Sequence, residues 1–356
     1  MRLLLVTNDY PPKPGGIQQY LGGLVAAVDA EVRVLAPFQP GARDEPGVFR
    51  GRRRFMWPTA PVRRWVEHHI GEFRPDVILF GAPHPLAHLG PRLRRDAGVP
   101  YAVLCHGAEV VVPAAFPITR QLLRHPLRRA DAVFTTSAYT SARVQRLIGK
   151  SPWVVGAGVD PAFSPGVTPP AGTVIGCVSR FVPRKGQRRV LAAAAELRAA
   201  GRDVSVLLVG RGRDERALRH LAEDLGVPTR FEVGVPFAAL PSLYRQMHVF
   251  AMPCRSRWLG LEAEGLGIVF LEASATGLPV VAGDSGGAPE TVLPGRTGFV
   301  VDGDDTLLEA LQLLLDDPAA AQAMGAAGAE FVRREYSWES VASRFREGLQ
   351  SVIDQR

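Results

Sequence analysis

The sequence has few cysteines and no long apolar run. Its three cysteines, Cys105, Cys177 and Cys254, form no C-x-x-C pair, so neither a disulfide framework nor a zinc site is indicated. No apolar stretch reaches the roughly 18 residues that a membrane-spanning helix needs, and the first one, residues 3–7, is too short for the core of a signal peptide. We therefore expect a cytoplasmic protein whose cysteines are small buried hydrophobic residues.

Negative charge is scarce in the first half of the chain. The 356-residue sequence has a net charge of +7; residues 1–170 hold 21 Lys and Arg against 12 Asp and Glu, whereas the remainder holds 21 against 23. This asymmetry indicates an anionic partner for the first half. The arginines gather in three clusters: Arg50, Arg52, Arg53 and Arg54; Arg63 and Arg64; and Arg120, Arg124, Arg128 and Arg129.

Short apolar runs rich in β-forming residues alternate with helical patterns along the whole chain. Such runs, with helices between them, are typical of parallel sheets covered on both faces. We expect strands at residues 3–7, 32–36, 77–80, 101–104, 133–136 and 154–155, and again at 173–178, 204–209, 230–233, 249–252, 279–282 and 298–301. The two series predict an α/β protein with two Rossmann-like, doubly wound domains.

The boundary between the two domains is expected in the proline- and glycine-rich segment 163–172. We predict one domain at residues 1–168 and the other at residues 172–337, with a C-terminal helix at about 338–356 that packs back on the first domain. Ligands of open α/β sheets bind beyond the carboxyl ends of the strands. The active site is therefore expected in the cleft between the domains.

A cationic loop follows the strand predicted at 173–178. Arg180 lies just after that strand and Lys185 just before the next helix. A helix N-terminus favours anions, Arg can hold two oxygens at once, and Lys adds a mobile charge. The loop could bind a diphosphate, or it could be a solvated basic loop.

The first strand leads into a proline- and glycine-rich turn at residues 11–19. This turn lacks the G-x-G-x-x-G fingerprint of dinucleotide-binding proteins, which disfavours NAD. Gly15 and Gly16 would let the backbone approach a ligand closely. A plain tight turn has the same composition.

Two glutamates and one histidine are further candidates. Glu264 lies in a glycine-rich loop, and Glu272 follows inside a helix that is expected to begin near Ile268. Both carboxylates could accept hydrogen bonds from one ligand, unless they are surface charges. His106 follows the strand predicted at 101–104, where a reactive side chain of an α/β protein belongs, although a single histidine can equally be structural.

Two patterns imitate metal sites. Asp302-Gly303-Asp304 matches D-x-D, but we assign these acids to a turn and cap before a helix that starts near Thr306, because nothing nearby adds further oxygen ligands. His68 and His69 are adjacent rather than at the spacing of metal ligands on a helix, and we expect both on the surface. We therefore predict no metal site.

Together these segments resemble retaining glycosyltransferases of family 4. The likeness runs from residue 3 to the tail near Trp338. Residues 7–12, 15–18, 182–187, 260–269 and 285–292 are similar to bacterial GDP-mannose-dependent α-mannosyltransferases that act on phosphatidylinositol mannosides. The resemblance implies the GT-B fold. Cys105 and Ala108 depart from the pattern of that group, which has Thr or Ser before the histidine and a second histidine at the position of Ala108.

For the donor, the resemblance implies that Arg180 and Lys185 hold the diphosphate and stabilise charge on the leaving group. Gly16 would approach the diphosphate through its backbone N–H, and Glu272 would bind the ribose. Glu264 would hold hydroxyls of the transferred sugar.

The remaining roles complete the implied site. The backbone N–H groups of Gly265, Leu266 and Gly267 would assist Glu264, and His106 would contact the sugar near its 6-hydroxyl. Gln18, with Asn8 and Asp9, would face the acceptor.

The implied reaction transfers mannose from GDP-mannose to a phosphatidylinositol mannoside, as the second mannose of the dimannoside. It needs no cofactor, and a metal is not required or stimulates only weakly. Alternatives are a family 4 transferase with a UDP-sugar or another acceptor, a nucleotide-sugar epimerase, or a non-catalytic membrane-binding protein.

Because the implied acceptor is a lipid, the basic clusters could also bind a membrane surface. A basic amphipathic surface is typical of peripheral membrane proteins, although a solvated helix face shows the same pattern. We expect association with the anionic inner face of the cell membrane. Nucleic acid is not expected as a partner, because no recognised binding motif accompanies the charge.

Overall fold

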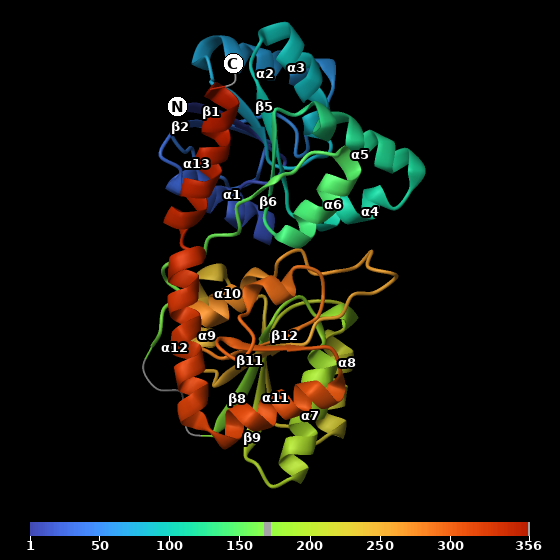
Figure 1. The fold of residues 1–356 in the computed structure, drawn as a ribbon, viewed down its shortest axis with the longest axis vertical. Coiled ribbons are helices and arrows are strands. Elements are labelled where there is room, and N and C mark those ends of the chain that lie inside the picture. Colours follow the sequence, from blue (N-terminus) through green and yellow to red (C-terminus); the bar gives the residue numbers. More distant parts are fainter. Residues whose placement is uncertain (167–171, 355–356) are drawn as a thin grey trace. The chain divides into compact units, whose positions relative to one another are not determined.

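The computed structural model describes residues 1–166 and 172–354, which form two compact units (Figure 1). Unit 1 comprises Met1–Gly158 and the segment that starts at Trp338, and unit 2 comprises Val159–Ser337. Of the segment predicted to separate the domains, residues 167–171 lie outside the described residues. None of the described helices is long and apolar enough to cross a membrane.

Unit 1 is built on a seven-stranded parallel sheet with the order β3-β2-β1-β4-β5-β6-β7. Strands β4, β5 and β6 are buried along their whole length, because helices cover both faces of the sheet. The strands are β1 (Arg2–Val6), β2 (Glu31–Ala36), β3 (Val48–Arg50), β4 (Val77–Phe80), β5 (Tyr101–Cys105), β6 (Ala132–Thr135) and β7 (Trp153–Val154).

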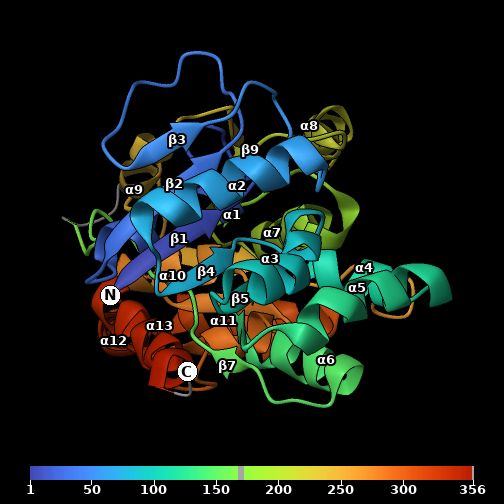
Figure 2. The same ribbon diagram turned by 90° about the horizontal axis from the view of Figure 1, so that it is seen from above.

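The helices of unit 1 divide between the two faces of this sheet (Figure 2). Helices α1 and α13 pack together on one face, where α13 contacts β4, β6 and β7. The other helices share the main hydrophobic core on the opposite face. They are α2 (Ala60–Phe73), α3 (Gly90–Ala97), α4 (Ala108–Ala114), α5 (Pro117–Arg129) and α6 (Ala138–Ile148); α1 is Gly16–Ala27 and α13 is Trp338–Asp354.

Unit 2 has a six-stranded parallel sheet with the order β10-β9-β8-β11-β12-β13. The strand order reverses beside β8, as in other doubly wound sheets, and ligands of such sheets bind at this edge. The strands are β8 (Thr173–Val178), β9 (Val204–Gly210), β10 (Thr229–Val233), β11 (Val249–Met252), β12 (Val280–Gly283) and β13 (Gly298–Val301).

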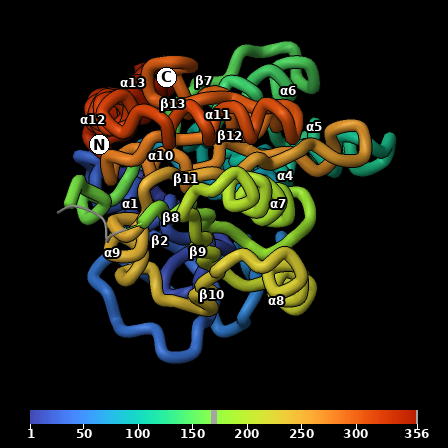
Figure 3. The backbone as a smooth tube through the Cα atoms, turned by 90° about the horizontal axis from the view of Figure 1, so that it is seen from below, coloured from blue at the N-terminus to red at the C-terminus, as the bar shows by residue number. Residues whose placement is uncertain are grey.

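The sheet of unit 2 is also covered on both faces (Figure 3). Helix α7 packs against α8 and α11 on one face, and α10 packs against α12 on the other. The helices are α7 (Gln187–Ala199), α8 (Glu215–Asp224), α9 (Leu240–Tyr244), α10 (Ile268–Ala275), α11 (Asp304–Asp316) and α12 (Pro318–Glu335). The two parallel α/β sheets agree with the sequence prediction except for β3, which was not expected.

All three cysteines are free and buried, which confirms their prediction as small hydrophobic residues. The placement of His69 on the surface was wrong. His69 is buried on α2, with its ring centroid 4.7 Å from that of Phe49 and 5.4 Å from that of Trp65. Burial lowers the pKa of His69, so its neutral ring packs among these aromatic side chains.

The predicted start of the helix near Thr306 was also wrong. Helix α11 begins at Asp304, and its N-cap is Gly303 rather than an aspartate. The Asp304 carboxylate instead forms ion pairs with Arg189 and Arg255. Thr306 supplies the cap, because its Oγ1 accepts a hydrogen bond of 3.0 Å from the Gly303 N–H.

Helix α13 completes unit 1 through Phe345. This side chain is fully buried, and its ring centroid lies 4.7 Å from that of Phe134 on β6. Replacing Phe345 by Ala should lower the free energy of unfolding by about 3–5 kcal/mol, because it leaves a cavity in a packed interface. Scanning calorimetry would show this as a lower Tm, with Glu347→Ala, an exposed site on the same helix, as the control. Equal Tm values for the two variants would contradict this packing role.

Candidate active site

The cationic loop of unit 2 is held in place from both of its ends. Gly186 follows Lys185 with a φ of 82°, and a Cβ at this position would lie 2.5 Å from the carbonyl oxygen of Pro253. Only glycine fits such a left-handed, crowded position. Gln187 is buried, and its Nε2 donates to Ser179 Oγ at 2.8 Å and to the Arg180 carbonyl at 2.9 Å. Strand end and helix start are thereby locked together.

The two predicted phosphate-binding cations differ in their surroundings. Arg180 is exposed, and within the described part of the chain no acceptor pairs with its guanidinium group. Lys185 is buried, and its Nζ lies 2.5 Å from Glu264 Oε2. Arg184 Nη1 lies 3.0 Å from the same oxygen. One carboxylate therefore holds two cations, while Arg180 remains open to a ligand.

Glu264 keeps its negative charge although its side chain is only 12% exposed. Burial alone raises the pKa of this carboxyl group, but Lys185 and Arg184 outweigh that effect and lower the pKa below its ordinary value. Removing either cation would leave part of a buried charge uncompensated, which is costly.

The loop that carries Glu264 packs tightly against a second glycine-rich loop. The Gly287 N–H donates to the Glu264 carbonyl at 2.9 Å, and Ser285 Oγ accepts from the Glu264 N–H at 3.3 Å. A Cβ on Gly286 would lie 2.0 Å from the Glu264 carbonyl oxygen. These contacts position the carboxylate from behind.

Helix α10 follows this loop, with Gly267 as its N-cap at a φ of 85°. Within residues 1–166 and 172–354, no protein acceptor bonds to the N–H of Leu266 or of Gly267. Such N–H groups at a helix start are suited to oxygen ligands.

Glu272 lies in the second turn of α10 and is buried. Burial raises its pKa to about 7, Tyr244 lowers it through a hydrogen bond, and the charge of Asp160 raises it. The Tyr244 hydroxyl donates to Glu272 Oε2 at 2.8 Å. Burial and the neighbouring carboxylate raise the pKa of Tyr244 itself, so its hydroxyl remains a donor at neutral pH.

His106 follows β5 in unit 1, as predicted. Its Nε2 lies 2.9 Å from the Gly81 carbonyl oxygen. Because a carbonyl oxygen only accepts, the proton lies on Nε2. The ring meets that of Tyr20 edge-on at 5.3 Å, and the Glu109 carboxylate accepts from the backbone N–H of His106. The imidazole is therefore held with Nε2 as the donor.

The glycine turn precedes α1 in the same unit. Gly16 is the first residue of α1, and a Cβ added there would meet nothing within 4 Å. The open space in front of a helix start is suited to an anion. At Gly15 a Cβ would lie 2.2 Å from Gln18 Oε1, so this glycine makes room for the Gln18 amide.

Of the three predicted acceptor residues, Asp9 and Gln18 are joined by a hydrogen bond, whereas Asn8 is not. Gln18 Nε2 donates to Asp9 Oδ1 at 2.6 Å, and Lys13 Nζ lies 2.8 Å from the same oxygen. Asn8 points elsewhere: its Nδ2 donates to the Met56 carbonyl at 3.0 Å, and its Oδ1 accepts from the Met56 N–H at 2.8 Å. Asn8 therefore ties this group to a distant segment.

The contacts join only some of the predicted site residues. In unit 2, Lys185 and Glu264 are paired and Arg180 lies in the same loop as Lys185, and in unit 1 Asp9 and Gln18 are hydrogen-bonded. Sequence reasoning missed the residues that hold these groups: Arg184, Gln187, Tyr244 and Ser285. Arg184 was visible beside Lys185, but nothing in the sequence marked it as a partner of Glu264.

Family models match both halves of the chain. The model for Glycosyltransferase Family 4 matches residues 14–163, and that for Glycosyl transferases group 1 matches residues 163–331. The chain belongs to the group 1, family 4 glycosyltransferases, which confirms the predicted family and the class of enzyme.

Two bacterial relatives and one solved structure are similar over almost the entire chain. A GDP-mannose-dependent α-(1-6)-phosphatidylinositol monomannoside mannosyltransferase of Mycolicibacterium smegmatis is 41% identical over 374 residues, 98% of each chain. A GDP-mannose-dependent monoacylated α-(1-6)-phosphatidylinositol monomannoside mannosyltransferase of Corynebacterium glutamicum is 38% identical, also over 98% of each. The structure of a sucrose-phosphate synthase from Thermosynechococcus elongatus matches 100% of both chains with a TM-score of 0.82 at 21% identity, which confirms the GT-B fold.

Proposed function

We propose that this chain transfers mannose, with retention, from GDP-mannose to phosphatidylinositol monomannoside and so forms the dimannoside. The observation that supports this most strongly is the identity of about 40% over nearly the full length to enzymes with that activity in their names. Unit 1 would bind the acceptor and unit 2 the donor.

In the proposed reaction, an acceptor hydroxyl oxygen bonds to the anomeric carbon, and the bond from that carbon to the diphosphate breaks. The bonding electrons leave with GDP, and the hydroxyl proton passes to a diphosphate oxygen. The negative charge develops where Arg180 and Lys185 would stand. Fixed cations stabilise such charge without the cost of reorganising water. Arg180 is suited to this role because its guanidinium group is exposed and unpaired among the described residues.

The neighbouring residues would bind the rest of the donor. Glu264, with the N–H groups of Gly265, Leu266 and Gly267, would hold hydroxyls of mannose, and Glu272 would accept from the ribose hydroxyls. Gly16 would approach the diphosphate with its backbone, which the open space in front of it supports. His106 would contact mannose through the ring that Gly81 holds in place.

On the acceptor side, Asp9 and Gln18 would hydrogen-bond the sugar head group. Asp9 has a second carboxylate oxygen beyond the one shared by Gln18 and Lys13. Asn8 would act as a positioning residue, because both ends of its amide bond to Met56.

A turnover screen of donors against acceptors tests the proposal. We expect product only with GDP-mannose and phosphatidylinositol monomannoside, and unchanged turnover in EDTA. Arg180→Ala and Lys185→Ala should each lower kcat by about 10²-fold, the scale of losing a charge-stabilising donor. Arg216→Ala, an exposed arginine on α8, is the control.

Each rival function predicts a different result in this screen. If product formed from a UDP-sugar or with another acceptor, the substrates proposed here would be wrong. Conversion of the donor without any acceptor would indicate an epimerase, and absence of turnover a binding protein. A normal rate for Arg180→Ala or Lys185→Ala would remove the assigned role of that residue.

The pH dependence of donor use should report Glu272. Its pKa is raised to about 7 by burial, so the carboxylate that would accept from ribose is lost as the pH falls through that value. Between about pH 8 and about pH 6, kcat/KM for the donor should fall by roughly tenfold, because this ratio reports ionisations of the free enzyme. Glu272→Gln should flatten this limb of the profile. If kcat/KM of Glu272→Gln fell in the same way as that of the wild type, the ionisation would belong to another group.

Peripheral membrane association is the second part of the proposal. Helix α5 contains no acidic residue, and within the described part of the chain no carboxylate pairs with Arg120, Arg124 or Arg128. Ile118 and Leu122 on the same helix are 79% and 52% exposed. An anionic lipid surface would satisfy both features.

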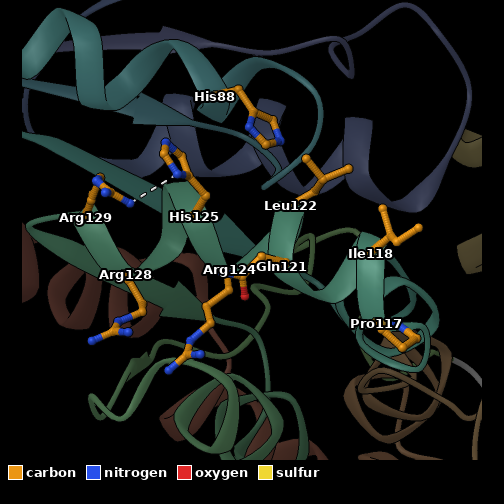
Figure 4. A pocket seen from close by; sticks show the side chains of 9 residues that line it. All are labelled: His88, Pro117, Ile118, Gln121, Leu122, Arg124, His125, Arg128 and Arg129. Carbon is orange, nitrogen blue, oxygen red and sulfur yellow. Dashed lines mark hydrogen bonds between the residues drawn. The ribbon is translucent and has the colours of Figure 1, made fainter.

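Helix α5 also borders a hollow of about 1120 Å³. Figure 4 shows Arg124 and Arg128 extending from the helix, with Ile118 and Leu122 further along it and Arg129 bonded to His125. His88 faces the same hollow, but burial, His84 and His125 lower its pKa to about 4. At neutral pH His88 therefore adds no positive charge to the hollow.

Vesicle sedimentation measures this association. Replacing both Arg120 and Arg128 by Gln should weaken binding to anionic vesicles by roughly thirtyfold, since each basic residue near such a surface contributes about 1 kcal/mol. Arg216→Gln is the matched control on unit 2. If the wild-type chain bound neutral and anionic vesicles equally, the electrostatic proposal would be wrong.

A further inference from the structure

A second hollow, of about 690 Å³, lies on unit 1 between β3 and the first turns of α2. Its size falls in the range of small-molecule sites. Three arginines and three aromatic side chains contribute to its wall: Arg50, Arg52, Arg53, Phe55, Trp57 and Trp65. This combination of cations and aromatic rings is suited to a ligand that is anionic at one end and apolar at the other.

The aromatic part of the wall leaves large apolar surfaces in water. Phe55 and Trp57 are 40% and 59% exposed, and their ring centroids lie 5.0 Å apart. Trp65, on α2, packs against the main core and also lines the hollow. Exposed aromatic side chains that adjoin each other at a hollow mark a binding surface.

The charged part of the wall has free cations. Arg52 and Arg53 are exposed, and among residues 1–166 and 172–354 no carboxylate pairs with either. Arg50 is fixed instead, since its Nη2 donates to the Pro11 carbonyl at 2.7 Å. A phosphate group could bind to Arg52 and Arg53 without breaking an existing ion pair.

The wall of the hollow is bonded directly to the loop that carries the proposed acceptor residues. Met56, buried in the wall, exchanges two hydrogen bonds with Asn8, and Arg50 bonds to Pro11. Asp9 lies beside Asn8 in the chain and bonds to Gln18. A head group bound by Asp9 and Gln18 would therefore contact a loop that is hydrogen-bonded to the wall of this hollow.

We propose that the hollow binds the glycerophosphate and the adjoining acyl carbons of the lipid acceptor. The inference rests on the proposed function and extends it to the lipid part of the substrate. Arg52 and Arg53 hold the phosphodiester, and Phe55, Trp57 and Trp65 cover the start of an acyl chain. The site recognises one acceptor molecule, whereas α5 meets the bulk bilayer.

Binding of monomeric lipid to the full chain tests the site without any turnover. The probes are dihexanoyl-phosphatidylinositol below its micellar concentration and glycerophosphoinositol, its deacylated form, each titrated by calorimetry. We expect the wild type to prefer the acylated probe by about tenfold or more, since each buried methylene strengthens binding severalfold. Phe55→Ser combined with Trp57→Ser should abolish that preference. Leu313→Ser, which removes a 60% exposed side chain of α11, is the matched control.

The phosphate contact has its own variant. Arg52→Gln combined with Arg53→Gln should weaken the binding of both phosphorylated probes by about tenfold. The ratio of the two affinities should stay unchanged. Arg216→Gln is the control. A second measurement uses an acyl chain brominated near the glycerol, which should quench tryptophan fluorescence less in Trp57→Phe than in the wild type.

The outcomes separate this site from the reaction. An acyl preference that survives loss of Phe55 and Trp57, or quenching that does not depend on Trp57, overturns the proposal. Loss of the preference in the aromatic variant alone supports it. The titrations contain no GDP-mannose and measure binding alone. Absence of mannose transfer in the turnover screen would therefore refute the proposed function, whereas the titrations would still test whether the hollow binds lipid.

Discussion

The shared carboxylate of Glu264 is the interaction on which the candidate active site depends. Lys185 and Arg184 both bond to one of its oxygens, and this pairing lowers the pKa of a mostly buried carboxyl group so that it stays ionised. It also joins the loop after β8 to the loop before α10.

The two units differ in how their charged side chains are arranged. Unit 2 offers a small number of well-positioned ions around a glycine-rich helix start. In unit 1 the arginines of the three clusters are mostly exposed, and among the described residues only Arg63 of these pairs with a carboxylate. A nucleotide sugar needs fixed geometry at its reacting bond. A lipid surface needs only enough positive charge beside apolar side chains. The ions of unit 2 and the arginines of unit 1 are thus suited to two different kinds of partner.

Much of the architecture could be predicted because buried parallel strands carry almost no polar residues, so that β4, β5, β11 and β12 stand out as apolar runs. The strand β3 was missed because it is three residues long and only partly buried. In the site, the sequence marks Arg180 and Lys185 by their position between strand and helix. The partners of the site residues could not be found in this way. Arg184 bonds to a residue 80 positions away, Tyr244 to one 28 positions away and Asn8 to one 48 positions away, and only folding brings such side chains together.

The contribution of α13 to unit 1 has a consequence for the order in which the protein is made. The first 158 residues leave the ribosome without the helix whose Phe345 covers Phe134 and whose Trp338 fills the space beside Gly23 and Gly158. Unit 2 is continuous in sequence and emerges entirely before α13. At roughly 5–20 residues per second, one face of the first sheet waits about 10–40 s for its covering helix. During that time the part of this face that α13 covers, including Phe134, is open to solvent and to any chaperone that binds apolar surfaces.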